Sequence, residues 1–407
     1  MATPTLVVTF DFSSGATFGY PFIIGEGVLG FNTLADAAAD IIDISNQVNK
    51  VTIRRGYNLL QEEFQAGTAT VRVLDFDGSW NPTNPASPYA GKLVPLRKVR
   101  ISAEGEFLFS GYTIAYNYTW DKEQNIGFVD IELADAFRLF NMSSITAVTG
   151  GTAGQTTGQR ITAILDTIGF PASMRDIQAG STTVQSDPGT SRTSLQAIDN
   201  MRFSEQGAFF IAPSGNAEFL SRATIQSKSG ANPTFFSNDG TGISYRNIIT
   251  ALDDKLIINT TSVTRAGGTA QTASNTASQI KYFPHSYTAT DLLLQTDAQA
   301  LDIAQAYTAT RAETTLRVDS LTLDLNTDDY AAGTTAALTL DFFDTIRVKN
   351  VGQDGTVIDK TLQCMGVTHE ITPSTWNTTF VTSEPIIDSF IIGSSLYGII
   401  GTSVMTY

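Results

Sequence analysis

The residues that could carry acid–base or metal chemistry in this 407-residue chain are few. It has two histidines, His285 and His369, and one cysteine, Cys364. His285 lies in a predicted loop, whereas His369 and Cys364 lie in predicted strands of alternating apolar and polar residues. Two histidines far apart in sequence are a poor basis for a zinc site, and a strand cysteine is typically a small buried residue. We therefore expect no catalytic residue, no metal site and no cofactor.

Acidic residues stand together at three places. Asp75-Phe76-Asp77-Gly78 could begin a calcium loop, but its glycine comes at the fourth position rather than the sixth. An Asp-Gly turn closing a hairpin is the simpler interpretation. Glu62-Glu63 and Asp253-Asp254 are adjacent pairs, and adjacent residues of a strand point to opposite faces. Neither pair suits a glycosidase, and no G-x-S-x-G, P-loop or H-E-x-x-H motif is present.

The composition is more typical of an assembly protein than of an enzyme. Hydrophobic residues make up 42% of the chain, enough for real cores, and charged residues only 16%, against about 25% in soluble domains. A weakly charged surface indicates cover by partner proteins. The net charge of −15 argues against a phosphate-binding surface, which needs clustered Lys and Arg. DNA could still pass nearby without specific binding.

The ends of the chain give no sign of secretion or membrane insertion. Residues 1–5 lack a basic region before an apolar run, so no signal peptide is predicted. The apolar stretch 386–400 contains Asp388, serines and glycines, and it is too short to span a bilayer as a helix. With one cysteine, no internal disulfide can form.

The periodicity predicts a mainly β protein with an α+β insert. Alternation as in Val51-Thr52-Ile53-Arg54 predicts short antiparallel strands between residues 50 and 140. Helices are predicted over 158–168, 191–205 and 291–311, with a hairpin over 208–220. Further strands are expected over 255–259, 262–265, 316–325, 345–348, 361–368 and 377–382, with a turn at Gln353-Asp354-Gly355.

These elements suggest four parts. We expect an N-terminal β-barrel-like domain over 1–140, a small α/β domain over 141–230 and a second β-barrel-like domain with one long helix over 231–385. Either β domain could be a barrel or a sandwich. Residues 386–407 are predicted to form a C-terminal arm, because this nearly uncharged segment would promote β-aggregation if left exposed. A fold-back onto its own domain is the alternative. The role of residues 1–50 is left open.

The two β domains read like copies of one unit. The first contains Lys98-Val99-Arg100-Ile101, then Phe109-Ser110-Gly111-Tyr112, then Trp120 and a closing strand over 129–133. The second contains Thr345-Ile346-Arg347-Val348, then Cys364-Met365-Gly366-Val367, then Trp376 and a closing strand over 378–382. The order of features is the same, which favours a duplicated barrel, although β-hairpins often look alike.

One segment resembles the opening of minor tail proteins of long-tailed bacteriophages. The residues that carry the resemblance are Ile53-Arg54-Arg55-Gly56-Tyr57-Asn58, Phe64-Gln65-Ala66-Gly67-Thr68-Ala69-Thr70-Val71, Asp75-Phe76-Asp77-Gly78-Ser79-Trp80-Asn81-Pro82-Thr83-Asn84, Ser87-Pro88-Tyr89, Leu96-Arg97-Lys98-Val99-Arg100-Ile101 and Leu108-Phe109-Ser110-Gly111-Tyr112. Thr368 to Trp376 with Phe380 resembles that family's closing strand pair, and Ala298 to Thr310 its helix before a barrel. Gly56 permits a turn, and Gly67 suits a bulge or a close crossing.

The resemblance implies a structural role in a phage tail. Proteins of this kind are similar to the baseplate hub of contractile tails, in which a trimer carries two barrel-like domains per subunit and six barrels form a ring. Such a homotrimer closes the tail tube, contacts the tail tube or distal tail protein, holds the end of the tape-measure protein and anchors a distal fibre or tip protein. The protein would belong to the virion tail tip and be assembled in the host cytoplasm, with no membrane span.

Three alternatives remain open. A hexameric distal tail adaptor would have one tube-like barrel per chain and six copies per ring rather than three. A tail-associated cell-wall hydrolase is disfavoured by the sparse histidines and the missing carboxylate motif. A host-glycan-binding module could stack sugars on Tyr116, Tyr118 and Trp120, although aromatic residues in a hairpin more often pack a sheet edge or an interface.

Overall fold

The computed structural model describes residues 4–13, 18, 40–58, 63–123, 125–228, 232–326 and 330–385. Its strands are β1 (Leu6–Asp11), β2 (Ile41–Asp43), β3 (Val48–Asn58), β4 (Glu63–Asp75), β5 (Lys98–Ala103), β6 (Glu106–Asp121), β7 (Ile126–Ala134), β8 (Ser144–Ile145), β9 (Arg175–Ile177), β10 (Arg192–Thr193), β11 (Ala208–Ile211), β12 (Ala217–Leu220), β13 (Thr234–Ser237), β14 (Asn247–Ala251), β15 (Thr260–Arg265), β16 (Gln271–Ser274), β17 (Ser286–Leu292), β18 (Arg317–Asp324), β19 (Thr345–Val351), β20 (Val357–Ile371) and β21 (Trp376–Ser383). The α-helices are α1 (Phe137–Met142), α2 (Thr157–Thr167), α3 (Ser194–Glu205), α4 (Arg222–Lys228), α5 (Thr276–Tyr282), α6 (Asp297–Thr310) and α7 (Tyr330–Thr339).

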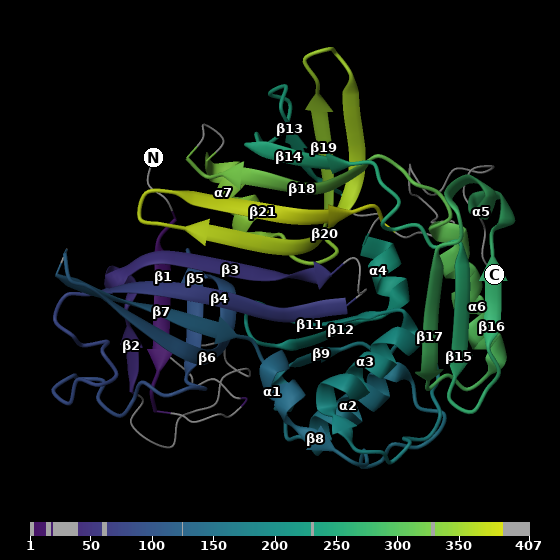
Figure 1. The fold of residues 1–407 in the computed structure, drawn as a ribbon, viewed down its shortest axis with the longest axis horizontal. Helices are drawn as coiled ribbons and strands as arrows, with labels where there is room; N and C mark the ends of the chain where they lie inside the picture. The colour runs from purple at the N-terminus through teal and green to yellow at the C-terminus, as the bar shows by residue number, and fades with distance from the viewer. Residues whose placement is uncertain are drawn as a thin grey trace.

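One sheet of 13 strands dominates the molecule (Figure 1). Its main path is β14-β18-β21-β20-β3-β4-β7-β6-β5-β1-β2, and β19 and β13 branch from β20. The buried faces of both ends of this path form one apolar core that includes Val71, Ile131, Leu321 and Phe380. The mainly β prediction is confirmed, but the barrel-like domains are corrected. Within the described ranges the strands form an open sheet that β3 and β20 join, because each half pairs with the other instead of closing on itself.

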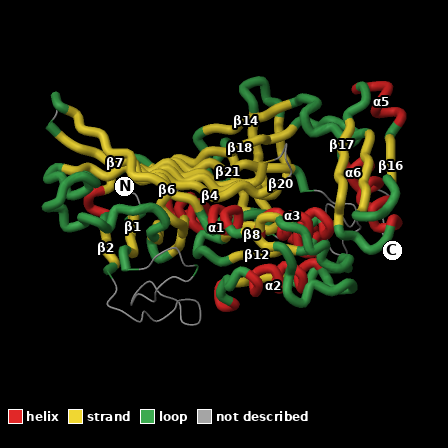
Figure 2. The backbone as a smooth tube through the Cα atoms, turned by 60° about the horizontal axis from the view of Figure 1, so that its bottom comes forward, coloured by secondary structure: helices red, strands yellow, loops and turns green. Residues whose placement is uncertain are grey.

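A small α/β unit lies on one side of this sheet (Figure 2). Helices α2 and α3 begin at capping boxes, in which the threonines Thr156 and Thr193 accept hydrogen bonds from the backbone three residues later. Their apolar sides pack with the hairpin β11–β12, and β9 adds to β12 in parallel. The helices and hairpin predicted between residues 158 and 220 are confirmed.

A separate three-stranded sheet, β16-β15-β17, packs against α6 at the opposite end of the molecule from β1 and β2 (Figure 1). The long helix begins at Asp297 rather than near Asp291, because Ser286–Leu292 is a strand and Thr296 provides the helix cap. The strand predicted over 255–259 is wrong. Asn259 there donates from its side chain to Ser278 Oγ and the Phe283 carbonyl, which stabilises an irregular segment instead.

Two sequence-based expectations fall on residues that the structure does not describe. The C-terminal arm, 386–407, lies outside the described residues, as does most of the segment before Asp40. Among the described helices, none is long and apolar enough to cross a membrane.

Candidate functional site

The histidines and the cysteine are not gathered in one site. His369 and Cys364 lie in β20, whereas His285 precedes β17 in another sheet. Burial lowers the pKa of His369 to about 3, with the Arg55 charge adding to the effect. Its Nδ1 lies 3.0 Å from Thr378 Oγ1. Burial raises the pKa of the Cys364 thiol well above its usual range, and the prediction of a small buried residue is confirmed.

The carboxylate pairs serve turns and ion pairs. The Trp80 amide donates to Asp75 Oδ2 over 3.2 Å and the Ser79 amide donates to Asp77 Oδ1 over 3.0 Å. The Asp77-Gly78 turn forms, but it closes no hairpin, because β4 pairs with β3 and β7 while the next strand, β5, pairs with β1 and β6. Across the described residues, no three His, Cys, Asp or Glu side chains form a group that could hold a metal ion.

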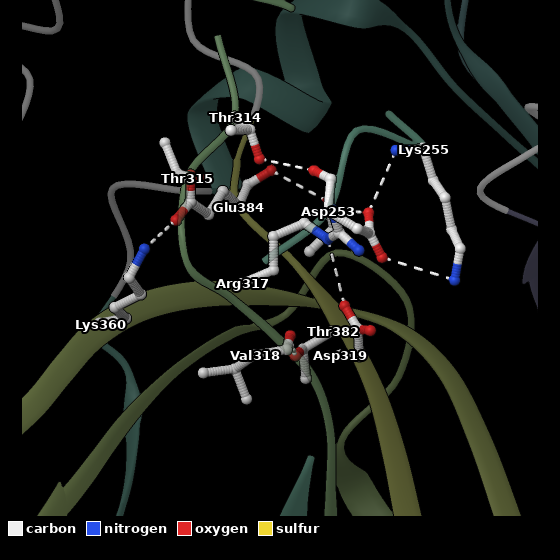
Figure 3. Close-up of polar contacts among 11 residues, drawn as sticks. Asp253, Lys255, Thr314, Thr315, Arg317, Val318, Asp319, Lys360, Thr382 and Glu384 are labelled. Carbon is white, nitrogen blue, oxygen red and sulfur yellow. Dashed lines mark hydrogen bonds and ion pairs between the residues drawn. The ribbon is translucent and has the colours of Figure 1, made fainter. Parts of the chain in front are cut away.

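A cavity of about 370 Å³ lies where α3, α6 and the ends of β18 and β21 meet. Figure 3 shows the polar network beside it. Arg317 lies between two carboxylates, with Nη1 2.9 Å from Asp253 Oδ1 and Nε 3.2 Å from Asp319 Oδ1. The Arg317 hydrogen bond lowers the pKa of Asp253 to about 2. Glu384 accepts from Lys360 and from Thr315 Oγ1.

This network joins the ends of strands that meet beside the cavity. It fixes the end of β21 against the start of β18, and neither histidine nor Cys364 lines the cavity. A carboxylate held ionised by an arginine is a weak base at neutral pH. Asp254 lies away from Arg317, with Oδ2 3.8 Å from His285 Nε2, and Glu62 lies outside the described residues. Asp253 and Asp254 therefore contact different basic groups, Arg317 and His285.

The large sheet contains two copies of one five-stranded arrangement. The order β5-β6-β7-β4-β3 in the first half matches β19-β20-β21-β18-β14 in the second, and every pairing is antiparallel. The strands also follow each other along the chain in the same order. The segment that contains β15, β16, α5, β17 and α6 is inserted between β14 and β18. At the equivalent place, between β3 and β4, the first half has only residues 59–62.

The residue register of the two halves agrees as well. One row of paired residues crosses the first half as Tyr116, Ile131, Val71 and Val51, and the corresponding row of the second half is Val367, Phe380, Leu321 and Ile248. The pairing of β6 with β7 shifts register between Thr113 and Ala115, and that of β20 with β21 shifts between Cys364 and Gly366. Equal strand order, this equal register and the shared bulge together indicate duplication.

The proposed match of the two tryptophans is wrong. Trp120 lies near the end of β6, whereas Trp376 begins β21. The register instead makes Trp120 the counterpart of Ile371, because Trp120 lies four residues after Tyr116 and Ile371 lies four residues after Val367. The hairpins Lys98 to Tyr112 and Thr345 to Gln363 do correspond as expected.

The junction between the halves is a ladder between β3 and β20 in which Gly56 lies opposite Gly366 and Val51 opposite Ile371. Both glycines sit where their strands shift register. A Cβ added to Gly366 would lie 3.2 Å from the Arg55 carbonyl oxygen and from Gly56 Cα. Gly56 was predicted to permit a turn. It allows the two backbones to approach closely instead.

Arg55 ties the junction to the small α/β unit. Its side chain is only 7% exposed, with Nη1 3.1 Å from Asp341 Oδ1, and Nη2 donating to Asp341 Oδ2 over 3.3 Å and to the Ile211 carbonyl over 3.1 Å. The guanidinium also lies over the Phe342 ring. One cation thus contacts the first half, the loop before β19 and the end of β11.

Two further carboxyls, the buried Asp135 and the half-buried Glu218, are influenced by the charge of this arginine. Burial raises the pKa of Asp135 to about 7, although its carboxylate accepts from the amides of Gly67 (2.6 Å) and Phe137 (2.9 Å). Burial, with the neighbouring Asp341 adding, raises the pKa of Glu218 to about 7. The Arg55 charge opposes both shifts. The close approach predicted at Gly67 is confirmed, because a Cβ there would lie 2.8 Å from Asp135 Oδ2.

Comparison with solved structures identifies the fold. The 43 kDa tail protein of prophage MuSo2 from Shewanella oneidensis matches 86% of this chain and 97% of its own at 12% identity and a TM-score of 0.57. A tail protein from Neisseria meningitidis MC58 matches 83% of this chain and 93% of its own at 11% identity and a TM-score of 0.56. The chain has the fold of phage tail proteins.

A third similarity extends over nearly the whole phage tail-protein fold. Prophage tail protein gp18 from Listeria monocytogenes EGD-e matches 93% of this chain and 94% of its own, at 11% identity and a TM-score of 0.50. No protein-family model and no curated protein matches the sequence. The resemblance drawn from the strand motifs is thus confirmed at the level of structure.

The sequence motif contains Arg55 and Gly56, but it did not predict that they lie at the junction between β3 and β20. A signal was present, because Arg55 follows Val51 and Ile53 at a spacing of two, which places it on the buried face of its strand. A buried arginine needs a carboxylate partner. That the partner is Asp341, 286 positions later, requires the fold.

The glycine contact at the junction gives a testable consequence. Gly366→Ala should destabilise the tail-protein fold by about 1–3 kcal/mol, because the new Cβ presses on the backbone of β3. Gly333→Ala is the matched control. Gly333 lies in α7, and its added Cβ would make only an ordinary 3.6 Å contact with Leu325. That variant should be neutral or slightly stabilising. Urea unfolding measures both, and equal stability of the two variants would contradict the close approach.

Proposed function

We propose that this protein is a structural hub subunit at the tip of a phage tail. In this role three copies form a ring of six equivalent sheet units that closes the tail tube, holds the end of the tape-measure protein and anchors a distal fibre or tip protein. The role is structural, and DNA passes through the ring without specific binding. Assembly takes place in the host cytoplasm before the protein becomes part of the virion.

The observation that carries the proposal is the duplication. A tail tube with sixfold symmetry can be matched by three chains only if each chain presents two equivalent units. The rows from Tyr116 to Val51 and from Val367 to Ile248 supply two such units in one continuous sheet. The similarity in fold to tail proteins supports the setting, and the net charge of −15 suits a wall that DNA must slide past.

Each part of the chain has its own role in this proposal. Residues 1–140 and 231–385 supply the two ring units, and residues 141–230 form a small domain on one side of the ring. The arm, 386–407, would contact a neighbouring subunit or a more distal tail protein. The distal tail adaptor, with six copies of a single tube-like unit, is the reading that the duplication disfavours.

Copy number separates the hub from the adaptor. Light scattering on the purified chain, together with the copy number in assembled tail tips, should give three times the mass of one 43.7-kDa chain per ring. Three copies provide six sheet units, which is the expected result. Six copies per ring would favour the adaptor and overturn the hub proposal.

A further inference from the structure

The junction inside the chain covers one edge of each strand that forms it. Residues 366–371 of β20 pair with β21 on one side and with β3 on the other. The inward-facing side chains Val367, His369 and Ile371 are consequently each only 4% exposed. On the other side of the ladder, Val51 and Ile53 of β3 are fully buried.

Among the described residues, the equivalent edges of the duplicate strands have no such cover. Residues 115–120 of β6 correspond to 366–371 of β20, and they pair with β7 alone; β5 reaches β6 only as far as Tyr112. In the second half, β14 corresponds to β3 and pairs with β18 alone. Over the part of the chain that the structure describes, no strand lies on the other edge of residues 115–120 or of β14.

These two uncovered edges carry apolar side chains. Trp120, which corresponds to the buried Ile371, is 50% exposed, and Ile249 of β14 is 52% exposed. Ile248, which corresponds to the fully buried Val51, is half-buried. An exposed strand edge with apolar residues is a template for pairing, and stable proteins cover it or blunt it with charge. Neither edge has a charged residue between positions 115 and 120 or between 247 and 251.

We propose that residues 115–120 of β6 pair with β14 of a second copy of this chain, in the antiparallel register that β20 and β3 use within one chain. Thr119 then lies opposite Ile249 of the next copy, and Trp120 opposite Ile248 of the next copy. Within the chain the corresponding pairs are Glu370 with Thr52 and Ile371 with Val51. This inference rests on the proposed function and names the surface through which its ring closes.

The occupant is a second copy of this chain, because β14 of one copy is the β3-like partner that residues 115–120 of another copy lack. The two edges are different strands, so their association is head-to-tail and each copy added leaves one free edge of each kind until a ring closes. The same strand pairing would then occur at every joint, alternately within and between chains. It also gives Tyr116, Tyr118 and Trp120 a place along the inward-facing side of an interface, where aromatic residues are favoured.

Engineered disulfides test the register directly. Thr119→Cys combined with Ile249→Cys in the full chain should give covalent trimers on a non-reducing gel after mild oxidation, because directly opposed residues lie within disulfide range. Glu370→Cys with Thr52→Cys is the positive control and should close within one chain without changing its mass. Asn117→Cys with Ile249→Cys is shifted by two residues and should give little product. The native Cys364 is buried and is left in place.

A charge on the edge tests the same surface without a disulfide. Ile248→Lys should abolish the trimer in light scattering, because Ile248 takes the place of the fully buried Val51 and the new ammonium would be buried in the joint. Ile280→Lys is the matched control, since Ile280 on α5 is 84% exposed and distant from both edges. It should leave the trimer intact, and both variants should remain folded, because Ile248 is only half-buried and Ile280 is exposed in the single chain.

The outcomes separate this inference from the hub proposal. A wild-type trimer whose Thr119/Ile249 cysteine variant forms no covalent oligomer, or one that survives Ile248→Lys, overturns the edge pairing while leaving the hub proposal standing. A ring of six copies with efficient Thr119/Ile249 cross-links would support the edge pairing and overturn the trimeric hub. Covalent trimers, with the shifted pair unreactive, would support both.

Discussion

Replacing Arg55 with methionine is expected to destabilise the fold by about 2–4 kcal/mol, since it removes a buried guanidinium and leaves the half-buried Asp341 without its partner. Methionine keeps much of the side-chain volume, so most of the loss reflects the charge and its hydrogen bonds. The Ile211 carbonyl also loses the donor that links the small α/β unit to β3. The free energy of unfolding in urea measures the effect.

Two controls assign the loss to the junction. Arg54, the preceding residue, is exposed, so Arg54→Met should change stability by about 0.5 kcal/mol or less. A double-mutant cycle of Arg55→Met with Asp341→Asn should show a coupling energy of at least about 1 kcal/mol, because the pair is bidentate. Additive effects of the two substitutions would contradict the role given to this pair.

The Arg55→Met loss should also depend on pH. In the folded protein Asp135 and Glu218 have pKa values raised to about 7, so near pH 5 both are protonated and gain little from the Arg55 charge. Above pH 7 both become ionised, and the arginine then stabilises them. The destabilisation should therefore be larger at pH 9 than at pH 5, and a loss that shrinks as the pH rises would contradict this account.

Acid should destabilise the protein through His369. Its folded pKa is about 3 against 6.5 for an ordinary histidine, so between these pH values the unfolded chain binds a proton that the folded one does not. The stability that the neutral ring provides is complete above pH 6.5 and declines by about 1.4 kcal/mol per pH unit below it. The total loss at pH 3 is on the order of 4 kcal/mol.

The comparison with His369→Gln isolates this contribution. The variant loses the Thr378 contact made by Nδ1 and is less stable at pH 8, but the difference from wild type should shrink steadily as the pH falls from 6.5 to 4. Asp135 and Glu218 oppose the trend, because their raised pKa values favour the fold as the pH falls, yet they do so in both proteins and cancel. A constant difference between wild type and His369→Gln would contradict a buried neutral ring.

The sequence predicts the elements better than their connections. The alternation around Val51 and Val71 and the helical stripes of α2 and α3 are local signals, and those elements form. The repeat was visible because hairpins such as Lys98 to Tyr112 and Thr345 to Gln363 are themselves local. The single open sheet was not, since it depends on whether β3 pairs with β20 or with its own half, and periodicity carries no information about partners.

The errors have similar causes. Trp120 and Trp376 were matched by their order along the chain, whereas they lie in strands that do not correspond, since Trp120 is in β6 and Trp376 begins β21, the counterpart of β7. The Asp77-Gly78 turn formed without a hairpin, because turn residues determine the local backbone and not the strand that follows. The strand predicted over 255–259 gave way to side-chain hydrogen bonds of Asn259.

A density map of the assembled ring by electron cryomicroscopy tests the central claim most directly. Three chains should appear as six sheet units around one axis, with β20–β3 joints inside chains alternating with β6–β14 joints between them. The residues Val51 and Ile248 should lie at the same radius, as equivalents in the two units. A ring of six chains, or three chains whose two halves lie at different radii, would contradict the account.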